Sequence, residues 1–144
     1  MADAPQGFFV AKVGMLGSRL DPEPFDLNAD LGPLPAAVVV SDWRHAAAET
    51  EVPPCGDAVI ERIGNDLMAS GTLWVETTRG RDVAVMLQHL GKRARFSVSY
   101  RILSARPPSR DERVGGIVRV LTKVRLLELS AVLVPAEPST RRSR

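Results

Sequence analysis

The chain has 144 residues, of which 44% are hydrophobic and 25% charged, a composition typical of one ordinary globular domain. Its single cysteine, Cys55, excludes an intramolecular disulfide and a cysteine-rich zinc site. The net charge is +2, but three arginines stand among the last four residues, and removing them leaves −1 for the rest. A nucleic-acid-binding domain normally has a basic surface, so we expect no nucleic-acid partner and a flexible basic tail at residues 139–144.

No apolar run is long enough to span a bilayer, and the first residues lack the basic and apolar segments of a secretory signal. We therefore expect a cytosolic protein without a membrane partner. Two scattered histidines without clustered acidic residues do not make a usual ligand set, so we also expect no metal and no other cofactor.

Residues 7–16 are apolar and predict a first strand. Residues 17–35 hold four prolines among acidic residues and predict an extended loop. The apolar residues 36–40 predict a buried strand, and residues 46–56 predict another loop. Residues 59–63 and 67–75 then read as a hairpin, because the turn-forming Gly64-Asn65-Asp66 stands between them.

The pattern next changes to a helical period. Val83, Met86, Leu87 and Leu90 fall on one helical face, and Gly91 is a suitable end for a helix over about residues 81–90. Alternation returns over residues 94–102, residues 104–113 predict a polar loop, and residues 114–133 predict two strands with a bend.

These elements predict one domain over residues 1–144, mainly β with some α. Its expected fold is a mostly antiparallel, closed or nearly closed β-barrel of about seven strands, flanked by one main helix.

Four residues stand out chemically. Ser97 and Ser99 share the polar face of one strand, and periodicity does not choose between them. A strand serine becomes a nucleophile only if a base reaches it, and His45, just past a buried strand, is the one plausibly placed base. Glu128 interrupts an apolar run, where a carboxylate should be hydrogen-bonded and could orient an imidazole. Purely structural roles remain open for all of them, and His89 reads as an exposed helix residue.

The order of these segments resembles that in the prohead (procapsid maturation) protease family of tailed bacteriophages, distant relatives of the herpesvirus assemblins. The resemblance covers roughly residues 36–140. It rests on an apolar strand ending in histidine (38–45), a hairpin (55–71), an amphipathic helix (82–91), a serine strand (95–100) and the closing segment 126–138, which resembles a Glu-x-Ser-x-Val-x-x-Pro-Ala-x-Pro ending.

The resemblance implies a serine endopeptidase that cleaves the major capsid protein or a scaffold protein inside the procapsid, in the host cytoplasm, and commonly cleaves itself. It also implies Ser97 as nucleophile, His45 as general base and Glu128 as the residue that orients the imidazole. Some assemblin relatives pair through a helix, which leaves a homodimer open.

Ser99 stands where the family usually has glycine, so it is the alternative nucleophile. It is also the one sequence feature that favours a catalytically inactive procapsid component. A small β-barrel binding module is the third alternative.

For the oxyanion donors, the residues around 104–116 offer Arg110, Arg113 and the backbone amides of Gly115 and Gly116. A solvated charged loop is the other interpretation of this segment.

Overall fold

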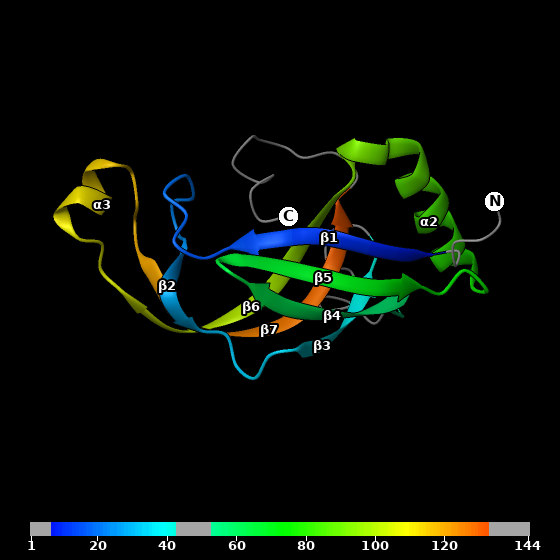
Figure 1. Cartoon of the computed structure of the whole chain (residues 1–144), viewed down its shortest axis with the longest axis horizontal. Helices are drawn as coiled ribbons and strands as arrows, with labels where there is room; N and C mark the ends of the chain where they lie inside the picture. Colours follow the sequence, from blue (N-terminus) through cyan, green and yellow to red (C-terminus); the bar gives the residue numbers. More distant parts are fainter. Residues whose placement is uncertain (1–6, 43–52, 133–144) are drawn as a thin grey trace.

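The computed structural model describes residues 7–42 and 53–132, and seven strands make up most of this part of the chain (Figure 1). The strands are β1 (Phe8–Met15), β2 (Phe25–Asp30), β3 (Ala36–Ser41), β4 (Gly56–Ile63), β5 (Asp66–Leu73), β6 (Arg95–Arg106) and β7 (Val120–Val132). The helices are α2 (Thr78–Leu90), the short 3-10 helix η1 (Gly91–Arg93) and α3 (Arg110–Val114). Within these residues, no helix combines the length and hydropathy needed to cross a membrane.

The seven strands form one mixed sheet in the order β1-β5-β4-β3-β7-β2, with β6 also pairing with β7. Among the described residues, four pairs are antiparallel, and β2 and β3 pair with β7 in parallel. Phe9 of β1 stacks on Phe96 of β6 with ring centroids 4.6 Å apart, so side chains bring the two ends of the sheet together. The predicted nearly closed, mostly antiparallel barrel with one main helix is thus confirmed. Its sheet is mixed, because two of the pairs are parallel.

Apolar side chains alternate into the interior of this barrel, as strand geometry requires. The largest fully buried ones include Leu16, Ile60, Leu67, Leu73, Leu121 and Leu129. From α2, Val83 completes the core at 1% exposure. The opposite face of each strand is thereby left to polar side chains or to solvent.

The predicted hairpin and helix are both present. β4 and β5 pair in register around a turn in which Gly64 has φ +64, a conformation that favours glycine. The helix ends at Gly91 with φ +55, as predicted, but it begins at Thr78. The side chain of Thr77 caps it by accepting a hydrogen bond from Gly80 N. The apolar period starts only at Val83, which is why the sequence pattern misses the first turn.

The prediction of an uninterrupted loop over residues 17–35 is wrong for β2. This strand pairs with the first half of β7, and β3 pairs with the second half in the same direction. The segment Phe25–Asp30 has no continuous apolar pattern, because only part of it packs on the core. Its strand conformation depends on a partner almost a hundred residues later, which local sequence does not reveal.

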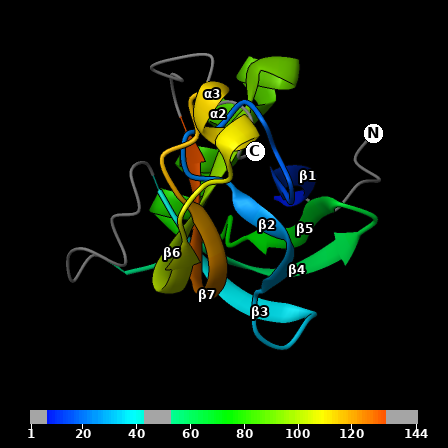
Figure 2. The same cartoon turned by 90° about the vertical axis from the view of Figure 1, so that its left-hand side faces the viewer.

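The second half of the chain extends into an arm, residues 101–125, formed by β6, α3 and β7, which lies at the left of Figure 1 and is seen end-on in Figure 2. The predicted loop over 104–113 is wrong here, because β6 continues to Arg106 and α3 follows. Ser109 and Glu112 form a reciprocal capping box, a signal that was readable in the sequence. β7 begins at Val120, rather than near residue 114, and is one strand with register shifts rather than two strands.

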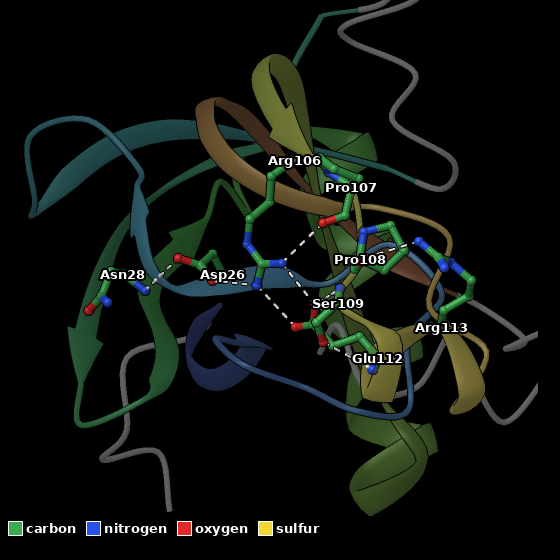
Figure 3. A network of polar contacts seen from close by, with 8 residues as sticks. All are labelled: Asp26, Asn28, Arg106, Pro107, Pro108, Ser109, Glu112 and Arg113. Carbon is green, nitrogen blue, oxygen red and sulfur yellow. Dashed lines mark hydrogen bonds and ion pairs between the residues drawn. The ribbon is translucent and has the colours of Figure 1, made fainter.

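Arg106, the last residue of β6, contacts α3 of the arm and the neighbouring strand β2 (Figure 3). Its guanidinium donates to both carboxylate oxygens of Glu112, at 2.8 and 3.0 Å, and to Asp26 of β2 at 3.2 Å. The hydrogen bonds from Arg106, followed by those from Ser109, lower the pKa of Glu112 from 4.5 to about 2. Arg106 thus ties α3 and β2 to the end of β6.

We expect α3 to open reversibly in acid. The pKa of Glu112 is lower in the folded protein than its ordinary 4.5, so its stabilising contribution is complete above about pH 4.5 and is lost as the pH falls toward 2. Amide hydrogen exchange, corrected for the intrinsic rate, should show decreasing protection of the α3 amides over this range.

Glu112→Gln should lower this protection already at neutral pH and remove most of its pH dependence. The matched control is Asp111→Asn, which neutralises the neighbouring exposed acid. Retention of the full pH dependence in Glu112→Gln would show that the Arg106 network does not hold the arm.

Candidate active site

The candidate site lies where β6, β7 and β3 run side by side. The strand register places three serines in one row across the sheet: Ser97 of β6, Ser130 of β7 and Ser41 of β3. The adjacent row on the same face consists of Ser99, Glu128 and Val39. Directly paired residues project to the same side of a sheet, so both candidate nucleophiles share a face with Glu128.

This polar face lies opposite the barrel core. Phe96 and Val98 alternate with the two β6 serines and are 4% and 8% exposed in the interior. Ser97 and Ser99 themselves are half-buried. The sequence prediction that the serines project away from the apolar face is therefore confirmed.

Glu128 is almost completely buried, at 1% exposure. Ser41, which is fully buried, donates a hydrogen bond from Oγ to Glu128 Oε2 at 3.0 Å. The sequence predicted that a carboxylate in this apolar run would be hydrogen-bonded, and this contact confirms it. A hydrogen bond to a charged group typically contributes about 1.5–3 kcal/mol, so it fixes one oxygen of the carboxylate firmly.

Ser41 is a residue that the sequence analysis missed. The signal available in the sequence was that this serine directly follows the three valines of the apolar strand β3. Its partner is 87 positions away in the sequence, so only the parallel pairing of β3 with β7 reveals the contact.

An ion pair fixes the end of β3 to the helix. Arg79 Nη1, in the first turn of α2, lies 2.5 Å from Asp42 Oδ2. The Asp42 side chain is only 12% exposed, so this pair is better shielded than an ordinary surface ion pair. Asp42, which directly follows β3, is thereby held against α2.

Cys55 lies close to this ion pair but is chemically quiet. Its thiol is fully buried, and burial, followed by the charge of Asp42, raises its pKa to about 11. The thiol therefore stays protonated at neutral pH, which removes the form that reacts as a nucleophile. The described ranges also bring together no group of three or more side chains arranged as metal ligands.

A comparison with known protein families places this geometry in context. The profile of the caudovirus prohead serine protease family matches residues 62–143, more than half of the chain. The chain belongs to the caudovirus prohead serine protease family. No curated protein and no solved structure matches it.

The match to the prohead serine protease family includes Ser97, Ser99 and Glu128 and begins after His45. His45 also falls in residues 43–52, outside the described residues, so its predicted role stays a prediction. Of the described candidates, the prohead protease fold brings the two serines and Glu128 to one face of three adjacent strands.

The proposed oxyanion donors are not brought to this face. Arg110 and Arg113 lie on α3, with Gly115 and Gly116 just after it, at the far end of the arm (Figures 1 and 2). Arg106 stands nine positions after Ser97 along β6, a span of about 30 Å. Within one chain the structure does not bring these four residues beside Ser97, and their role as oxyanion donors stays a prediction. The segment that contains them forms the tip of a long two-stranded extension made by β6 and β7.

His89 is exposed on α2, as the sequence predicted.

Proposed function

We propose that this chain is the endopeptidase that cleaves the major capsid protein or a scaffold protein inside the procapsid, and also cleaves itself. In this proposal Ser97 is the nucleophile, His45 the general base and Glu128 the residue that orients the imidazole. The observation that supports it is the buried, hydrogen-bonded carboxylate of Glu128 on the same strand face as Ser97.

The two-row arrangement favours Ser97 over Ser99. Ser99 is paired directly with Glu128, whereas Ser97 is the diagonal neighbour, paired with Ser130. Direct neighbours have Cβ atoms about 5 Å apart and diagonal neighbours about 7 Å. An imidazole that bonds both groups separates their oxygens by the ring and by two hydrogen bonds of about 2.8 Å each. The diagonal pair leaves more room for that ring than the direct pair does.

The chemistry then follows the general acid–base pattern. His45 accepts the Ser97 hydroxyl proton while Oγ bonds to the scissile carbonyl carbon, and the carbonyl electron pair moves to its oxygen. When this intermediate collapses, the carbon–nitrogen bond breaks and the imidazolium gives its proton to the leaving amine. Glu128 stabilises the imidazolium, and a water molecule activated by His45 later releases the acyl group.

Co-expression with the cognate capsid protein tests this function. We expect the capsid or scaffold chain to lose a terminal segment in the presence of the wild-type protein, as measured by intact-mass spectrometry. A matched culture expressing the same chain with Ser97→Ala and Ser99→Ala should yield uncut substrate. Uncut substrate with the wild-type chain, in assembled procapsids, would favour a non-catalytic procapsid component.

A further inference from the structure

A groove opens beside the start of β6, between the two unpaired ends of the barrel. It has a volume of about 540 Å³ and is lined from β1, the end of α2, η1 and β6. Among the described residues, β1 pairs only with β5 and β6 pairs only with β7, so one main-chain edge of each strand lacks a strand partner. Figure 1 shows η1 and the start of β6 above β1.

The lining of this groove combines apolar surface with positive charge. Phe9, Ala11 and Leu87 provide apolar surface, and Lys12, Lys92 and Arg95 provide the cations. No carboxylate is among its described lining residues. Lys12 forms a half-exposed ion pair with Asp66 at 3.2 Å, while Lys92 is exposed on η1. The groove therefore complements an acidic ligand with apolar side chains.

Arg95 connects this groove to the candidate nucleophile. It stands two residues before Ser97, so both side chains project to the same face of β6. The Arg95 guanidinium donates hydrogen bonds to the carbonyl oxygens of Lys92 (2.7 Å) and Ala94 (2.9 Å), and these bonds hold it near η1. A chain that lies in the groove in extended form, along the edge of β6, therefore continues toward Ser97.

We propose that this groove binds an extended, acidic segment of the substrate chain and so selects where the protease cuts. The proposal rests on the proposed function, because the bound segment belongs to the substrate. Extended peptides can bind along the edge of a strand, and their alternate side chains then give specificity. Here the cations select alternate acidic side chains, and the apolar lining accepts the residues between them.

Peptide binding to the full chain carrying Ser97→Ala tests this, because turnover is then removed. The probes are three fluorescein-labelled peptides in which the same apolar residues alternate with glutamate, glutamine or lysine. We expect fluorescence anisotropy to show the glutamate peptide binding about tenfold more tightly than the glutamine peptide, and no binding of the lysine peptide. This preference should weaken as salt is added.

Lys92→Glu and Arg93→Glu form a matched pair of variants. Both residues are exposed on η1 and both changes alter the net charge equally, but only Lys92 lines the groove. Lys92→Glu should weaken binding of the glutamate peptide by about fivefold or more, and Arg93→Glu by less than about twofold.

Equal affinity for the three peptides, or equal weakening by the two variants, would overturn the proposal. Tighter binding of a single-stranded oligonucleotide than of the glutamate peptide would assign the groove to nucleic acid instead. A failure of the proposed function would give a different outcome from a failure of the groove proposal. If capsid protein stays uncut by the wild-type chain while the glutamate peptide shows this pattern, the groove is supported and the peptidase activity is not.

Discussion

Ser97→Ala abolishes processing of the capsid or scaffold chain, whereas Ser99→Ala retains most of it: this is the result we expect from paired co-expression experiments. Removing the nucleophile of a Ser-His-acid triad lowers kcat by about 10⁶-fold in a well-studied protease. Ser97 is half-buried and projects away from the core, so loss of its hydroxyl should lower the free energy of unfolding by only about 1 kcal/mol or less. The processed fraction is measured by intact mass, and folding by thermal unfolding.

Ser99→Ala is the matched control because it removes the same group from the same face of β6, one pleat away. Wild-type processing in Ser97→Ala, with no processing in Ser99→Ala, would assign the nucleophile to Ser99. Processing that persists in the double variant would mean that another enzyme makes the cut. This result would favour the interpretation of the chain as a non-catalytic procapsid component.

Glu128→Gln should lower the rate of processing strongly while the protein stays folded. The amide oxygen can still accept the hydrogen bond from Ser41, but the negative charge that stabilises an imidazolium is lost and the wrong imidazole tautomer is favoured. The corresponding change in a serine protease triad lowers kcat by about 10⁴-fold, less than loss of the nucleophile. Because the change neutralises a buried charge, thermal unfolding should shift little.

Glu128→Asp is the control for this variant, since it keeps the charge and shortens the side chain by one methylene group. We expect it to process the substrate faster than Glu128→Gln does in single-turnover assays. If Glu128→Gln instead retains the wild-type rate, Glu128 acts only as a structural partner of Ser41.

The parts of this fold that could be predicted are those specified by neighbouring residues. The alternation of Phe96 and Val98 with two serines defines β6, and the glycine at position 64 defines the turn of the β4–β5 hairpin. β2 could not be found in this way, because its conformation depends on β7. α3 could have been found from its capping box, but the surrounding prolines and charges favoured a loop.

The same distinction applies to the site. Alternation alone places Ser97 and Ser99 on one face, and the apolar run around Glu128 predicts that its carboxylate is hydrogen-bonded. The partner, Ser41, and the diagonal relation between Ser97 and Glu128 depend on the register of three strands. Register depends on side-chain packing between strands that are distant in the chain, and no local pattern in one sequence specifies it.

Three strands pair with β7, and this affects when the candidate site can form during synthesis of the chain. β2, β3 and β6 all pair with this strand, and of the described strands it is the last to leave the ribosome. A growing chain that stops short of β7 has neither Glu128 nor the surface that aligns Ser41 with Ser97. Pairings over such long sequence separations form slowly. Synthesis therefore keeps the candidate nucleophile apart from its supporting carboxylate until β7 has been made.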